Sequence, residues 1–332
     1  MTAKRIGLAL SGGGSKGAFT VGALKVIRQK LDSATFPVIS GTSTGSLIGT
    51  MLTTNDWSTL VDIYSNVQTE NIVNPHHALV ADVLGPEAGL FAAAVLGGRA
   101  IYDTTALKAT IQANVDFIKI KDRASKTLLI YNTVDLQTGE VVAFNNKDQS
   151  PTMLLNSLLA SASMPVLMDP VDITLGGVTH QYVDGGVREF LPLGAVFESG
   201  VELDLIIGIS TAPLDARKHA GGYDKITEIL GRTVDLLDTE VGANDYWGAQ
   251  QFNAMLQMIE NAVGLGISKT QLLKDVPAGV TTRLKEKRPV PVVLVAPKAH
   301  LELDSLDFDS TTIKDLMKVG VAAAKDALQG VL

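Results

Sequence analysis

Two glycine-rich turns in the first fifty residues do most to limit the fold of this chain. The apolar run Ile6–Leu10 leads into glycines and then into a helical pattern from about 16 to 31. The segment FPVIS leads in the same way through GTSTGS into a second apolar helix, roughly 44–52. Because parallel sheets are built from strands that alternate with helices, this repeat predicts an α/β fold with a mainly parallel sheet.

Apolar runs farther along the chain predict more strands. They fall at 126–146, as a hairpin turning at 137–139, at 178–184, at 203–210 and at 289–297. The last two are apolar enough to be buried central strands. Between them, 215–288 is mostly helical in pattern, and we expect it to form an insertion or cap within a single domain spanning 1–332.

The composition limits the partners and the chemistry. With 332 residues, 46% of them hydrophobic, the chain can bury a sizeable core. Its net charge of -7, without a strong basic block, argues against nucleic acid as a partner. The absence of cysteine rules out disulfides and thiolate metal sites.

Apolar stretches do not predict a membrane span. The run Ile6–Leu10 is too short for a secretory leader, so we expect a cytoplasmic protein. The stretch 77–98 is interrupted by charged residues and a proline, and we expect a pair of short helices there. Apolar side chains at 78–96 and 238–267 are expected to be buried by packing rather than to form a lid or a lipid-contacting surface.

The first glycine turn resembles two nucleotide motifs but lacks part of each. Gly12, Gly14 and Gly17 fit the dinucleotide pattern G-x-G-x-x-G between a strand and a helix. That site also needs an acid at the end of the second strand, and Asp32 lies before this strand instead. A P-loop needs Ser or Thr after its lysine, whereas Gly17 follows Lys16. A third interpretation, that this is a tight turn that binds no ligand, stays open.

The second glycine turn matches G-x-S-x-G with Ser43 at its centre, between Gly41 and Gly45. A serine at a sharp strand-to-helix turn has an exposed hydroxyl, and the N–H groups that follow point at whatever is bonded to it. Ser43 is therefore a candidate nucleophile, with a plain helix N-cap as the alternative. Both turns lie at the carboxyl ends of parallel strands, which places the N–H groups of Gly13 and Gly14 to hold an oxyanion.

A nucleophilic serine needs a base, and the candidates are a histidine or Asp184. The histidines are His76, His77, His180, His219 and His300. Only His300 suits the chain order of α/β-hydrolases, but Ser43 follows the second strand, too early for that fold. Asp184 ends a predicted strand, and Gly185 and Gly186 leave room beside it. Burial would raise its basicity, although an Asp-Gly turn bonded to its own backbone is the alternative.

Three motifs in this order resemble the patatin-like phospholipase family. They are GGGSKG at 12–17, GTSTG at 41–45 and DGG at 184–186. The segments SASMPVLMDPV and YNTVDLQTGEVVAF are also similar to stretches of that family. The resemblance covers roughly 5–212 and resumes weakly at 290–328, whereas 215–288 has no counterpart. It implies a three-layer α/β/α fold with a mainly parallel central sheet.

The resemblance also implies hydrolysis of lipid esters through a Ser–Asp dyad, without metal or cofactor. Ser43 would attack the ester carbonyl, and Asp184 would take its proton and later activate water. The implied oxyanion hole is Gly12, Gly13 and Gly14, and the supporting residues are Lys16, Gly17, Gly41, Thr44, Gly45, Gly185 and Gly186. The partner would be a lipid ester, with a membrane surface as one place to meet it. A dinucleotide-binding module and a non-catalytic protein on the same scaffold are the alternatives.

Overall fold

The computed structural model describes residues 4–30, 35–76, 98–215, 222–301 and 308–329. Eight strands form the main sheet: β1 (Arg5–Leu10), β2 (Thr35–Thr42), β5 (Leu128–Asp135), β6 (Val141–Asn145), β7 (Val171–Leu175), β8 (Val178–Asp184), β9 (Leu205–Ile209) and β10 (Val292–Val295). Two further short strands, β3 (Asn74–Pro75) and β4 (Tyr102–Asp103), pair with each other.

The sheet has the order β10-β9-β1-β2-β5-β8-β7, and β6 also pairs with β5. From β10 to β5 all neighbours are parallel, whereas β6 and β8 run antiparallel to β5 and β7 antiparallel to β8. The predicted mainly parallel sheet is therefore confirmed. Because β1 and β2 are parallel, the two glycine turns that follow them leave the same edge of the sheet.

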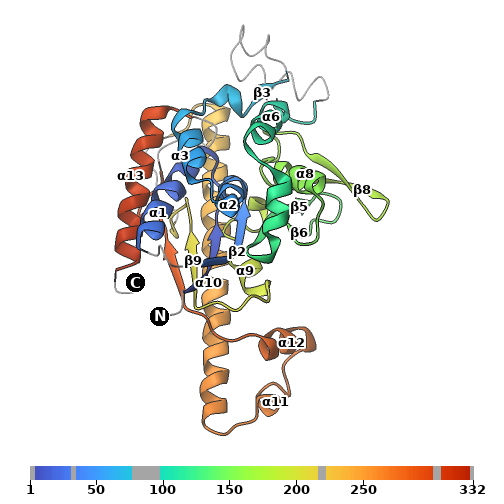
Figure 1. The fold of residues 1–332 in the computed structure, drawn as a ribbon, viewed down its shortest axis with the longest axis vertical. Helices are drawn as coiled ribbons and strands as arrows, with labels where there is room; N and C mark the ends of the chain where they lie inside the picture. The colour runs from blue at the N-terminus through green and yellow to red at the C-terminus, as the bar shows by residue number, and fades with distance from the viewer. Residues whose placement is uncertain (1–3, 31–34, 77–97, 216–221, 302–307, 330–332) are drawn as a thin grey trace.

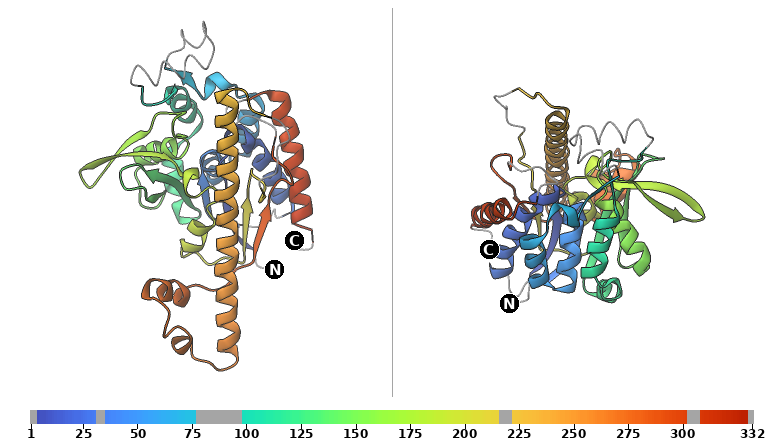
Figure 2. Two further views of the ribbon diagram at one scale, coloured as in Figure 1. Left: turned by 180° about the vertical axis from the view of Figure 1, so that it is seen from behind. Right: turned by 90° about the horizontal axis from the view of Figure 1, so that it is seen from above.

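The helices are α1 (Gly17–Lys30), α2 (Thr44–Thr54), α3 (Trp57–Asn66), α6 (Thr105–Asn114), α7 (Phe117–Asp122), α8 (Pro151–Ser161), α9 (Leu193–Glu198), α10 (Ile226–Gly264), α11 (Lys269–Leu272), α12 (Ala278–Glu286) and α13 (Ser310–Ala327). Short 3-10 turns are η1 (Gly14–Lys16), η2 (Thr69–Asn71), η3 (Arg123–Ser125) and η4 (Gly185–Val187). Helices α1, α2 and α13 cover one face of the sheet, and α9 and α10 cover the other, which completes three layers (Figures 1 and 2).

Burial on both faces explains why the central strands β1 and β9 are continuously apolar. Along β1, Leu8 and Leu10 enter the core under α1 and α2, while Ala9 enters the core under α9. On the first face, α1 and α13 pack closely, since a Cβ atom at Gly22 would collide with the Met317 carbonyl. A continuous apolar run is typical of such doubly covered strands.

Helix α10 is 39 residues long, and only part of it lies against the sheet. Its middle packs on α9 and η4, and its C-terminal part extends beyond the sheet, where α11 and α12 pack against it (Figure 1). Leu256, Leu273 and Leu284 form a small separate core there. These helices occupy most of 215–288, whose role as an insertion or cap stays a prediction.

Two expectations about the apolar segments are wrong. The strand predicted at 289–297 is not central, because β10 lies at the edge of the sheet with most of its side chains only partly buried. Residues 238–267 are not simply buried: Trp247, Met258 and Leu265 are more than half exposed, because the second half of α10 is covered on one side only. The predicted helices at 77–98 fall almost wholly outside the described residues. Within the described helices, none is both long and apolar enough to cross a membrane.

Candidate active site

Ser43 occupies a strained turn between β2 and α2. Its backbone has φ 55° and ψ -125°, a conformation that residues with side chains rarely adopt. The flanking glycines make the turn possible, because a Cβ atom at Gly45 would collide with the Leu10 carbonyl oxygen and one at Gly41 with the Gly45 backbone. The predicted sharp turn is thus present, and it holds Ser43 at the N-terminus of α2.

A network of serines also fixes this turn. The N–H of Ser43 donates to the Ser161 hydroxyl at 3.2 Å, and this hydroxyl donates to the Asn132 carbonyl at 2.7 Å. The hydroxyl of Ser46 lies 2.8 Å from the hydroxyl oxygen of Ser161. The backbone of Ser43 is therefore tied to α8 and, through Ser161, to β5.

Asp184 ends β8 beside this turn and is buried. Its Oδ1 accepts the Gly186 N–H at 2.8 Å, and its buried Oδ2 accepts no hydrogen bond from any described residue. Burial raises the pKa of Asp184 to about 6, against the opposing effects of the Ser43 hydroxyl and the Gly186 N–H. The Ser43 hydroxyl is thus near enough to favour the charged carboxylate. The predicted serine and aspartate are brought together.

The glycine loop after β1 lies against Ser43, since a Cβ atom on Gly12 would be 3.2 Å from the Cβ of Ser43. Gly13 and Gly14 have positive φ angles of 123° and 55°, which glycine tolerates. Within the described chain, their N–H groups donate to no protein acceptor. By contrast, the N–H of Gly12 donates to the Phe190 carbonyl at 3.2 Å. Of the three predicted donors, Gly12 therefore has no N–H to offer.

Two residues far along the chain anchor the loop to its neighbours. The Thr211 hydroxyl donates to the Gly12 carbonyl at 2.6 Å, and the Thr211 N–H donates to the Ser11 hydroxyl at 2.9 Å. Lys16 is buried, and its Nζ lies 2.6 Å from Oδ1 of Asp235 on α10. The loop is thus held between the sheet edge and α10.

Two more of the predicted supporting residues, Gly17 and Gly185, lack room for a side chain. Gly17 faces the hydroxyls of Thr44 and Tyr64, which are hydrogen-bonded to each other. A Cβ atom at Gly185 would lie 2.5 Å from the Asn132 carbonyl oxygen, so only glycine fits there without movement.

A second acid near the site, the partly buried Asp238, had no signal in the sequence. Burial raises the pKa of Asp238 on α10 to about 8, opposed by Lys16 and reinforced by the charges of Asp184 and Asp235. A long-range contact of this kind has no local motif, so no sequence pattern connects α10 with the glycine loop. In the described residues, no group of three or more His, Asp or Glu is placed to hold a metal ion.

An apolar cavity opens at Ser43, with about 930 Å³ of empty space that is partly open to solvent. Gly14, Ser43 and Thr44 line it at the site. Apolar side chains of α2, α3, α6 and neighbouring segments supply most of the rest: Leu47, Met51, Leu60, Ile63, Val67, Ile72, Leu107, Ile111, Val115, Met164, Met168 and Phe308. The cavity suits an alkyl chain better than a polar group.

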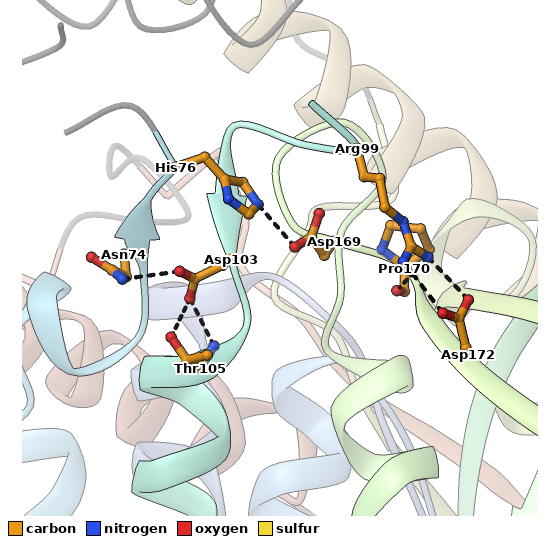
Figure 3. Close-up of polar contacts among 8 residues, drawn as sticks. All are labelled: Asn74, His76, Arg99, Asp103, Thr105, Asp169, Pro170 and Asp172. Atoms are coloured by element: carbon orange, nitrogen blue, oxygen red, sulfur yellow. Dashed lines mark hydrogen bonds and ion pairs between the residues drawn. The ribbon is translucent and has the colours of Figure 1, made fainter. Parts of the chain in front are cut away.

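The histidines that the structure describes have other partners. Nε2 of His76 lies 2.8 Å from Asp169 (Figure 3), and Nδ1 of His180 lies 2.6 Å from Asp135. Nε2 of His300 lies 3.5 Å from the Arg232 guanidinium. In the part of the chain that is described, the base nearest Ser43 is therefore Asp184; His77 and His219 lie outside it.

Hydrogen bonds shown in Figure 3 tie together the segments around His76. Arg99 donates to the carboxylate of Asp172 and to the Pro170 carbonyl, and Asn74 donates to Asp103. Asp103 in turn accepts the Thr105 N–H at 2.8 Å. These contacts hold β3 and β4 beside the turn that leads into β7. The contact between His76 and Asp169 is part of this structural network.

Comparison with known proteins identifies the family. The family model for patatin-like phospholipase matches residues 8–197, more than half of the chain. Among solved structures, the crystal structure of VipD from Legionella pneumophila is similar, with 11% identity, a TM-score of 0.42, and alignment over 98% of this chain and 67% of that chain. No curated protein matches the sequence. The chain belongs to the patatin-like phospholipase family, a family of lipid acyl hydrolases.

Proposed function

We propose that this protein is a serine acyl hydrolase that cleaves lipid esters with Ser43 as nucleophile and Asp184 as base. The observation that carries the proposal is that the hydroxyl of Ser43, which lines an apolar cavity, lies close enough to the Asp184 carboxylate to lower its pKa. Oδ2 of this carboxylate accepts no hydrogen bond from any described residue. A raised pKa makes this carboxylate a better proton acceptor than an exposed one.

The reaction takes place in two halves. In the first, Oγ of Ser43 bonds to the ester carbonyl carbon while its proton moves to Asp184. The bond to the alcohol then breaks, and the alcohol leaves with the proton from Asp184. In the second half, water gives a proton to Asp184 and attacks the acyl carbon. The bond to Oγ breaks, Oγ regains its proton, and the fatty acid leaves.

The negative oxygen of each tetrahedral intermediate is assigned to the Gly13 and Gly14 N–H groups. Three features support this: the N–H groups have no protein acceptor among the described residues, their loop lies against Ser43, and Gly14 lines the cavity. The N–H of Thr44, at the N-terminus of α2, is a third donor. Donors fixed in advance of the reaction stabilise charge that exists only in the transition state.

The test is labelling with a fluorophosphonate probe, which reacts with activated serines, together with hydrolysis of fatty acyl esters. Wild-type protein and the exposed-serine control Ser58→Ala are expected to be labelled, and Ser43→Ala is not. Asp184→Asn is expected to lose about 10²-fold or more of the hydrolysis rate, and the exposed control Asp172→Asn to keep it. Labelling of Ser43→Ala, or normal turnover by Asp184→Asn, would overturn the dyad.

The dinucleotide-binding alternative makes a different prediction. It requires protection from thermal unfolding by NAD that Ser43→Ala does not alter. The described end of β2 offers no acid for a ribose, since it continues directly through Thr42 into Ser43. No observation on the site favours this alternative.

A further inference from the structure

Five exposed apolar side chains lie in a line along α10. They are Ile229, Leu236, Trp247, Met258 and, directly after the helix, Leu265, with exposed fractions between 41% and 84%. Their intervals are 7, 11, 11 and 7 residues. At 3.6 residues per turn, 7 and 11 residues fall within about 20° of two and three whole turns, so the five share one face of the helix. We call them the α10 ridge.

The ridge points away from the rest of the molecule. Helix α10 packs inward through Gly242, Ala249 and Leu256, which are also seven residues apart and lie on the opposite side of the helix. Seen from behind, α10 lies in front of the other elements along its whole length (Figure 2). A second molecule can therefore reach the entire ridge.

The chemistry of α10 favours a protein partner over an anionic membrane. The helix carries Glu228, Asp235, Asp238, Glu240, Asp245 and Glu260 but a single basic residue, Arg232. Helices that lie on anionic bilayers have basic residues beside their apolar face. Trp247 is also held in place, because its ring packs edge-on against Tyr246, whose hydroxyl accepts a hydrogen bond from Gln250 at 3.0 Å. A fixed tryptophan is typical of the centre of a protein interface.

The intervals of the ridge read the same in both directions, with Trp247 at the centre. Two copies of α10 laid antiparallel about this residue would bring Trp247 against Trp247 and Leu236 against Met258. Ile229 would face Leu265. We propose that two copies of this chain associate through the α10 ridge in an antiparallel, twofold-symmetric dimer. Such an isologous contact requires a patch that complements itself, which the symmetric spacing supplies.

The size and charge of the face are compatible with this pairing. The ridge spans 37 residues, about 54 Å of helix, and a strip roughly 10–12 Å wide gives about 1,100–1,300 Å² over both partners. This reaches the lower end of the range for specific interfaces. The acid nearest the line of the ridge, Glu240, faces Ala254 of the other copy, and its carboxylate accepts a hydrogen bond from Asn244 at 3.2 Å. The two copies of Glu240 would be about 21 Å apart, so like charges do not meet.

Disulfide trapping tests the arrangement, because the chain has no cysteine of its own. Under mild oxidation, Trp247→Cys is expected to link to its own copy. Leu236→Cys and Met258→Cys are each expected to stay unlinked alone and to link when mixed. Self-linking of Leu236→Cys would overturn the antiparallel arrangement, as would failure of the mixture to link.

Sedimentation of the full chain at micromolar concentration tests the dimer itself. Wild type is expected to sediment as a dimer, and Trp247→Glu to weaken the association at least about tenfold in Kd. The matched control Val263→Glu, also exposed on α10 but off the ridge, is expected to leave it unchanged. Circular dichroism checks that both variants fold. A monomeric wild type, or a wild-type dimer that Trp247→Glu leaves intact, overturns the proposal, as does binding of the monomer to anionic vesicles through Trp247.

Discussion

The ammonium group of Lys16 lies 2.6 Å from the carboxylate of Asp235 and joins the glycine loop to α10. The two side chains are 8% and 29% exposed, so the pair is largely shielded from water. One partner precedes α1 and the other lies 219 residues later. The contact therefore fixes α10 over the loop to which we assign the oxyanion.

Removing the charge of Asp235 should loosen this arrangement. Asp235→Asn leaves Lys16 largely buried with a weaker partner, and we expect a loss of about 1–3 kcal/mol in the free energy of unfolding. Because the loop is less firmly held, turnover of esters should fall as well. Denaturant unfolding and ester hydrolysis measure the two effects. Glu260→Gln, an exposed change on the same helix, is the control, and equal stability of both variants would show that the pair does not hold α10.

The pH dependence of hydrolysis should follow Asp184. Its pKa is raised to about 6, mainly by burial, and a base must be ionised to accept a proton. We therefore expect kcat/KM for a short-chain ester to fall about tenfold per pH unit below pH 6 and to be level above it. The residual activity of Asp184→Asn should lack this step. A wild-type profile without an inflection between about pH 5 and 7 would exclude Asp184 as the base.

Asp238 should make the folded protein less stable as pH rises. Burial raises its pKa to about 8, whereas an aspartate in the unfolded chain has a pKa of about 3.9. Between these values the folded state keeps a proton that the unfolded state has released, so this group's contribution to stability falls with rising pH. Asp238→Asn should therefore raise the Tm more at about pH 8 than at about pH 5. A gain that is equal at both values would contradict the shift.

The apolar cavity should set the chain length of the substrate. Ile63 lines it and is partly exposed, so Ile63→Trp should fill part of the space without overpacking the core. Hydrolysis of long-chain esters should fall relative to that of acetyl esters, by about tenfold or more. Ile118→Trp, at a 67% exposed position outside the cavity, is the control. An unchanged ratio would show that the acyl chain binds elsewhere.

The sequence was sufficient for the parts of the site that depend on local structure. Ser43 directly follows β2 and Asp184 ends β8, and the pairing of both strands with β5 places these two ends side by side. Contacts that depend on tertiary packing could not be predicted. The Phe190 carbonyl accepts the N–H of Gly12, and Asp235 pairs with Lys16. No local sequence pattern links the two residues of either pair. Likewise, the apolar residues of α10 indicate a covered face, but periodicity does not say what covers it.

The close contact between α1 and α13 has a consequence for how this protein folds while it is being synthesised. Gly22 meets Met317, and Gly320 meets the Phe19 carbonyl, so α1 packs against a helix that is synthesised about 280 residues later. At roughly 5–20 residues per second, about 15–60 seconds separate the two helices on the translating chain. Throughout this interval, one flank of α1 has no partner. A nascent chain of this kind needs protection from aggregation until α13 has been synthesised.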